Sequence, residues 1–299
     1  MAITATRPLT TSPARTDSRQ AAAPSGRSSR HRTGWVLRIV LAAIVFVVMA
    51  FPLWIMLVTA FSGLRVFERS FSIWPQQIST ANFTRVFSTW PVGTWFGNSI
   101  TVTVITTILT VVISTLAGYA FAKLRFPAKT PLFLLLLATM MIPIQAILVP
   151  QFKIVNALGL VGTFWAVILP GAAATFGIFL ARQFMLSIPD EVIEAAKIDG
   201  AGAGRIFLSI VLPLCKPLLA VLTLLTLMYQ WNDFLWPLIA LRDPDFYTLP
   251  IGLQFLQGQY QTDYGALMAM TLISVAPLVI LFLAFQRFFV QGLATTGLK

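Results

Sequence analysis

The chain has little of what most soluble enzymes are built from. Of its 299 residues, one is cysteine (Cys215), one is histidine (His31), and only 10% are charged, where a soluble domain carries about 25%. A single cysteine excludes an intrachain disulfide and a multi-cysteine metal site. A single histidine in a polar N-terminal stretch argues against a histidine-based catalytic or metal centre. We therefore expect no catalytic residues and no metal ligands.

Apolar residues are what the chain has in excess. They make up 57% of it, with a mean hydropathy of +0.83. This excludes a disordered chain, and so few charges could not cover the surface of an ordinary soluble protein. The composition predicts an all-α polytopic membrane protein. Six segments contain about 20 predominantly apolar residues, the length that crosses a bilayer, and they run over 35–61, 99–122, 132–149, 164–185, 218–240 and 265–288.

The first 34 residues differ from the rest, because they are rich in Ser, Thr, Ala, Pro and Arg and contain one acid, Asp17. They resemble an organellar transit peptide only superficially. We interpret residues 1–34 as a disordered cytoplasmic tail and 35–299 as the membrane domain.

Basic residues indicate the orientation of the spans. An even number of spans places both termini on one side, and most of the 21 Lys and Arg residues fall on that side. The positive-inside rule therefore predicts cytoplasmic N and C termini. The net charge of +11 is explained by this pattern, so it does not indicate nucleic-acid binding.

The connection over 187–217 is the longest on the predicted cytoplasmic side and holds four of the ten acids. Ser187 and Asp190 have the spacing of a capping box. A helix is expected from Pro189 to Asp199, ended by Gly200, which accepts left-handed dihedrals. A second helical segment should follow, and Pro213 and Pro217 should break it before the fifth span.

This connection predicts a docking surface for a partner protein. Ala195 and Ala196 form a small-residue surface, and Glu194 and Asp199 can pair with basic groups. The expected apolar anchors are Val192, Ile193, Ile198 and Phe207. The alternative is an amphipathic helix lying on the membrane, which is disfavoured because such helices are rich in Lys and Arg.

The run EAAKIDGA over 194–201, followed by Phe207, Ile210, Pro213 and Pro217, resembles the EAA loop of bacterial ABC importer permeases. The run WNDFLWPL over 231–238, GYAFA over 118–122 and MIP over 141–143 are similar to the carbohydrate-uptake branch of that family, the MalG type. The resemblance covers about 98–290.

The resemblance implies a type I importer permease fold in the bacterial cytoplasmic (inner) membrane. It implies a heterodimer with a second permease, two ATP-binding subunits and an extracytoplasmic binding protein that delivers a sugar, expected to be a di- or oligosaccharide. The coupling helix would dock into the ATPase, with Glu194 paired to a basic group, Ala195 and Ala196 in the cleft, and Gly200 shaping the turn. Asp199 and Ala201 complete the set of coupling residues. No GxxxxGK[ST] run is present, so we expect no cofactor, ATP being bound by the partner subunits.

Polar and aromatic residues in the spans are candidates for the substrate pathway. An ionisable group within a span usually faces protein or water, and Asp233 lies near the outer end of the fifth span. The pathway candidates are Gln145, Tyr229, Asn232, Asp233 and Trp236. For each, a structural bond between helices or a place in the interfacial aromatic belt is the alternative.

Alternative functions would require other features of the sequence. The same architecture could carry a sugar phosphate or a glycerophosphodiester. A secondary transporter would need charged relays and repeats, a membrane-embedded enzyme would need clustered ligands or paired carboxylates, and a channel would need a charged ring. The sequence favours none of these three.

Overall fold

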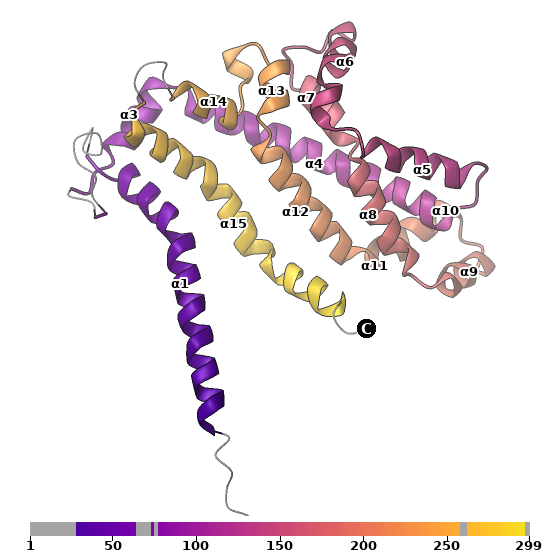
Figure 1. The fold of residues 1–299 in the computed structure, drawn as a ribbon. Coiled ribbons are helices and arrows are strands. Elements are labelled where there is room, and N and C mark those ends of the chain that lie inside the picture. Colours follow the sequence, from indigo (N-terminus) through magenta and orange to yellow (C-terminus); the bar gives the residue numbers. More distant parts are fainter. Residues whose placement is uncertain (1–27, 64–72, 75–76, 258–261, 297–299) are drawn as a thin grey trace, which may run out of the picture. The chain divides into compact units, whose positions relative to one another are not determined.

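The fold is helical over the residues that the structure describes, which are 28–63, 73–74, 77–257 and 262–296 of a computed structural model. The sole extended pairing in these ranges is an isolated bridge between Ser62 and Ile78. The predicted tail covers residues 1–34. Residues 1–27 lie outside the described residues, and residues 28–34 are helical, as the first part of α1. Figure 1 shows the elements: α1 (Ser28–Ala60), α3 (Ala81–Thr89), α4 (Val92–Lys123), α5 (Lys129–Thr139), α6 (Ile144–Ala157), α7 (Trp165–Ala172), α8 (Thr175–Leu186), α9 (Asp190–Ile198), α10 (Ala203–Ile206), the π-helical η1 (Phe207–Val211), α11 (Leu212–Leu214), α12 (Lys216–Asn232), α13 (Leu235–Ala240), η2 (Pro244–Phe246), α14 (Leu249–Phe255) and α15 (Tyr264–Thr296).

The chain divides into two compact units, Met1–Pro52 and Leu53–Lys299. The first unit contains most of α1, and the apolar side chains over 35–49 are exposed, among them Phe46 and Met49 at 71% each. So large an exposed apolar surface is typical of a helix that faces lipid or a partner protein. The remainder of α1 belongs to the second unit, where Ala60 joins a buried cluster.

Four helices among the described residues are long and apolar enough to cross a membrane, and two bent helix pairs bring the possible number to six. The predicted count of six is therefore reached only if each bent pair forms one span. The third predicted span, 132–149, is not one continuous helix, because α5 and α6 meet at 103°. Pro143 lies at the break as the N-cap of α6, with the extended conformation φ −62°, ψ 137°, and the missing N–H of proline prevents α5 from continuing.

The fifth predicted span, 218–240, is also broken. Helix α12 ends at Asn232 and α13 begins at Leu235, with Asp233 extended between them. The break expected from Pro213 and Pro217 is confirmed, because the helical segment before the fifth span ends at Leu214 and meets α12 at an angle of 78°. The bend falls at Cys215, between the two prolines, and Pro217 lies in the first turn of α12, where no N–H donor is needed.

Helix α4 is the centre of the second unit and packs against α7, α8 and α12 (Figure 1). Buried Thr and Ser side chains line its contact face, and the hydroxyl of Thr110 donates to the carbonyl of Gly171 at 3.2 Å. Close approach requires Gly118, since a Cβ there would lie 2.5 Å from Cβ of Ala181 on α8. The small residues and hydroxyls of α4 therefore allow its backbone to lie directly on α8.

Candidate functional site

Helix α9 is the predicted cytoplasmic helix, and its ends follow from its sequence. Asp190 and Glu191 occupy the first turn and Lys197 the last, which complements the helix dipole. At the C-terminal end, Ala201 N–H donates to the carbonyl of Ala196 at 2.9 Å and Gly200 N–H donates to that of Lys197 at 3.0 Å. With Gly200 at φ +80°, this is a Schellman motif, so the predicted glycine terminator is confirmed.

The beginning of α9 differs from the prediction. Its N-cap is Pro189, without a side-chain capping bond. The hydroxyl of Ser187 donates to the carbonyl of Phe184 at 2.7 Å, so it closes the end of α8. The capping box predicted from Ser187 and Asp190 is therefore wrong, because the preceding helix takes the hydroxyl.

One side of α9 is buried against the rest of the protein. Ile193 and Ala196 are 4% and 8% exposed, in a cluster that includes Met185 of α8 and Phe207 of η1. Two of the four predicted anchors, Ile193 and Phe207, therefore belong to the chain's own core. Ala196 lies there as well and does not extend the exposed surface.

The opposite side of α9 is free. Glu194, Ala195, Asp199 and Gly200 are exposed, as is Ile198 at 86%, while Ala201 is half-buried. These residues form one contiguous polar and apolar surface at the end of the helix bundle. We call it the α9 surface.

Lysine 123, at the C-terminal end of α4, ties α9 to the membrane helices. Its ammonium donates to the carbonyl of Ile188 at 2.6 Å and to the carboxylate of Asp190 at 2.5 Å. Its side chain is only 4% exposed. The hydrogen bond and charge of Lys123 hold the pKa of Asp190 below its usual value. Tyr119 of α4 makes a similar bond to the start of α10, where its hydroxyl donates to the carbonyl of Ala203 at 3.3 Å.

The second part of the site is a cavity of about 600 Å³ that borders the breaks in the third and fifth spans. It is within the usual range for small-molecule sites. Apolar side chains from the α5–α6 connection and from α6, α7, α8, α12 and α13 line it. Six polar side chains line it as well: Gln151, Thr175, Thr226, Tyr229, Gln230 and Asp233. None of the described residues that line it is Lys or Arg.

The structure brings three of the five pathway candidates to this cavity. Tyr229, Asp233 and Trp236 line it. Trp236 is buried, and its indole N–H donates to the carbonyl of Ala166 at 2.9 Å. Gln145 and Asn232 are exposed outside the lining, and the Asn232 amide donates to the carbonyl of Met228 within α12. The pathway roles of Gln145 and Asn232 stay predictions, but neither residue lines the cavity with the other three candidates.

Thr226, Gln230, Gln151 and Thr175 also line the cavity and are not among the residues predicted from the sequence. Thr226 and Gln230 could have been predicted from the sequence. Together with Tyr229 and Asp233 they follow the i, i+3, i+4, i+7 spacing of one helix face. Gln230 lies against α7, where a Cβ on Gly171 would be 2.6 Å from its Nε2 atom. Gln151 reaches the cavity from α6, whose direction after the 103° break no local pattern predicts.

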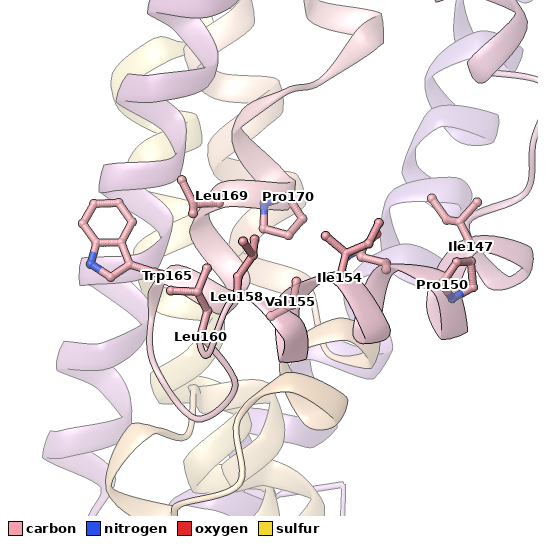
Figure 2. A pocket seen from close by; sticks show the side chains of 10 residues that line it. Ile147, Pro150, Ile154, Val155, Leu158, Leu160, Trp165, Leu169 and Pro170 are labelled. Carbon is pink, nitrogen blue, oxygen red and sulfur yellow. The ribbon is translucent and has the colours of Figure 1, made fainter.

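An apolar groove of about 490 Å³ adjoins this cavity, and Ile147, Gln151 and Pro170 line both. Figure 2 shows the groove between α6 and α7, with side chains such as Ile154, Leu158 and Trp165 around it. All but one of the lining side chains are apolar. The groove therefore offers few hydrogen bonds to a hydroxylated ligand.

Comparison with known proteins identifies the class to which this architecture belongs. Residues 111–295 match the family described as "Binding-protein-dependent transport system inner membrane component". The arabinooligosaccharides transport system permease protein AraQ of Halalkalibacterium halodurans is 38% identical over 272 residues, 89% of this chain and 96% of AraQ. The sn-glycerol-3-phosphate transport system permease protein UgpE of Yersinia pestis is 32% identical, over 81% of this chain and 90% of UgpE.

A solved structure has the same fold. A chain of a bacterial ABC transporter that imports the acidic polysaccharide alginate superposes with a TM-score of 0.81, covering 88% of this chain and 98% of that one at 23% identity. The protein belongs to the inner-membrane permease family of binding-protein-dependent transport systems. It is a multi-pass component of the bacterial inner membrane, and the resemblance seen in its EAA loop is confirmed.

Proposed function

We propose that this chain is one of two permease subunits of an ATP-driven importer, and that it carries a sugar, most simply a di- or oligosaccharide. The relatives support a carbohydrate, since AraQ is named for arabinooligosaccharides. The proposed partners are a second, different permease, two ATP-binding subunits and an extracytoplasmic binding protein. The chain itself is not an enzyme and holds no cofactor, since ATP is bound and hydrolysed by the partner subunits.

The observation that carries the proposal is the α9 surface. It presents Glu194, Ala195, Ile198 and Asp199 at a helix end that is fixed from behind by the buried Ile193. A short helix with one free apolar and acidic face suits a groove lined with basic groups. Its position between two spans supports the proposal that α9 faces the cytoplasm and carries ATPase motion to the membrane helices.

The contacts behind α9 explain how such motion would spread. Lys123 joins α9 to α4, and the shared core joins it to α8 and α12. A shift of α9 would therefore move three helices that border or support the 600 Å³ cavity. This fits a rigid-body transition between two packed states, biased by nucleotide.

The cavity favours a neutral sugar over a phosphorylated substrate. UgpE is named for sn-glycerol-3-phosphate, which makes a sugar phosphate or glycerophosphodiester the second candidate. The described lining has one carboxylate, Asp233, and no Lys or Arg. A phosphate would be repelled there, whereas hydroxyl groups could bond to Gln151, Tyr229 and Gln230.

Substitution of Glu194 tests the docking role. We expect Glu194→Lys, expressed with its partner subunits, to lose uptake and binding-protein-stimulated ATP hydrolysis while membrane insertion stays intact. Glu191→Lys is the matched control, because it makes the same charge change on an exposed position of α9 outside the EAA run. Unchanged co-purification with the ATPase together with unchanged stimulated activity would refute the proposal.

A further inference from the structure

A second, smaller cavity lies between the α4–α5 connection and α9. Its volume is about 140 Å³. Four cationic side chains and two carboxylates line it: Lys123, Arg125, Lys129, Lys197, Asp190 and Glu194. A single cavity with this many cations is unusual in a chain with so few charges. The α9 surface shares Glu194 with it, but none of the four cations.

Two of the four ammonium and guanidinium groups are fixed in place by the backbone. Lys129 donates to the carbonyls of Ala122 and Leu124 at 3.2 and 2.9 Å. Lys123 donates to the carbonyl of Ile188 and pairs with Asp190. An ammonium has three N–H donors, so Lys129 keeps one for a ligand. These bonds fix the positions of Lys123 and Lys129. The charge of Lys129 is not neutralised, because its partners are backbone carbonyls and not carboxylates.

The remaining charges in the cavity do not balance. Once Lys123 and Asp190 are paired, Arg125, Lys129 and Lys197 face a single carboxylate, that of Glu194. Within the described part of the chain, Arg125 and Lys197 make no side-chain hydrogen bond or ion pair. Arg182 adds a further cation nearby, held over the ring of Phe133 at 4.1 Å. Crowded like charges repel one another, and an anion in the cavity would relieve that repulsion.

The place of the cavity in the fold indicates the source of the anion. The connection over 124–128 joins the ends of two apolar helices, so it lies at the level where a span meets lipid headgroups. Beside it, α5 exposes Leu132, Leu134 and Leu135 at 47%, 59% and 65%, a surface that acyl chains can cover. Basic pockets at the ends of membrane helices bind anionic headgroups.

We propose that this cavity binds a phosphate group, and that the group is the headgroup phosphate of an anionic phospholipid. Arg125 and Lys197 supply charge-assisted hydrogen bonds from the two sides of the cavity, and Lys129 supplies one from its base. The lipid then bridges the α4–α5 connection and α9. The binding site itself does not depend on the transported substrate or on ATPase docking.

The experiment compares two double variants in the purified transporter complex. Arg125→Gln with Lys197→Gln removes two cations from the cavity. Arg205→Gln with Lys216→Gln removes the same charge from exposed positions outside the cavity lining and serves as the matched control. Retention of phosphatidylglycerol and of phosphatidylcholine is measured by native mass spectrometry, and inorganic phosphate is titrated in a thermal-shift assay.

We expect the cavity variant to bind phosphatidylglycerol about thirtyfold more weakly, since it lacks two basic groups and each one near a headgroup contributes about 1 kcal/mol. The control variant should keep wild-type retention, and phosphatidylcholine should not be retained in either. A charge-conserving exchange, Arg125→Lys with Lys197→Arg, should restore binding. A thermal shift with inorganic phosphate, lost only in the cavity variant, would assign the site to a free phosphate anion. Equal phosphatidylglycerol retention in both double variants, with no cavity-dependent phosphate effect, would overturn the proposal.

Discussion

The ammonium of Lys123 lies 2.5 Å from the carboxylate of Asp190, and this ion pair joins the last residue of α4 to the first residue of α9. The two residues are 67 positions apart in the chain. The pair is asymmetric, because the lysine side chain is 4% exposed and the aspartate side chain is 74% exposed. The buried partner therefore positions the exposed one, and with it the beginning of α9.

Removing the buried lysine should weaken the link between α9 and the membrane helices. Lys123→Met leaves the carbonyl of Ile188 without its donor, which costs about 1–3 kcal/mol of unfolding free energy for a buried group. Because α9 is then less firmly tied to α4, we expect less substrate transported per ATP hydrolysed. The measurement is uptake and ATP hydrolysis in the same proteoliposomes.

Because Lys123 acts by positioning α9, the decisive quantity is the ratio of sugar uptake to ATP hydrolysis. Lys216→Met is the control, since it removes an exposed cation from the same end of the bundle. If uptake and ATP hydrolysis fell by the same factor in Lys123→Met, the variant would contain less folded transporter with unchanged coupling. That result would contradict the positioning role.

The pair should also make stability depend on pH. Lys123 lowers the pKa of Asp190, so the ionised carboxylate is favoured in the folded state. The stabilisation is fully present above the ordinary carboxyl pKa and is lost as the pH falls through the lowered value. We expect the difference in Tm between wild type and Asp190→Asn to be constant near neutral pH and to disappear in acid. In the Lys123→Met background the same comparison should show a much weaker pH dependence, because only the charges of Lys197 and Arg125 then still lower the pKa of Asp190.

The carboxylate and the phenol in the larger cavity should affect transport without affecting ATPase docking. Asp233→Ala and Tyr229→Ala each remove a polar group that faces the cavity, so we expect slower sugar uptake with normal co-purification of the ATPase. Asn232→Ala is the matched control, because Asn232 is adjacent to Asp233 yet outside the lining. Wild-type uptake of every candidate sugar by Asp233→Ala would remove Asp233 from the pathway.

Helix α4 offers a matched pair of glycines that tests its packing on α8. A Cβ at Gly118 would be 3.0 Å from backbone atoms of Ala181 and Arg182, which cannot rotate away, whereas a Cβ at Gly97 has nothing within 4 Å. We expect Gly118→Ala to lower the unfolding free energy by about 1–3 kcal/mol. Gly97→Ala should be neutral or stabilising, because alanine is the better helix former. Thermal denaturation in detergent measures both, and equal Tm values would contradict the close contact.

Local features of the fold were the most predictable from sequence. The helix expected from Pro189 to Asp199 is present as α9, since its dipole-complementing charges and its glycine terminator act within one segment. The polar face of α12 could also have been found, because Thr226, Tyr229, Gln230 and Asp233 share helical spacing. The EAA run led to the permease family, which the comparisons confirm.

Features that depend on competition between segments could not be predicted. Ser187 was available to cap either α8 or α9, and only the packed structure shows that it bonds to Phe184. Pro143 allowed either a mild kink or a sharp break, and the bend of 103° is set by how α5 and α6 pack on other helices. Gln145 and Gln151 looked alike in sequence, and only the second borders the cavity.

The sequence by itself determined the apolar spans, the concentration of acids in one connection and the glycine that ends α9, because hydropathy, charge and backbone preference are properties of single residues. The tertiary structure alone decided which side of α9 is free, since Ala196 is buried against the helix bundle while Ala195, its neighbour in the chain, is exposed. It also brought Lys123 to Asp190, because contact between residues so distant in the chain exists only after the helices have packed.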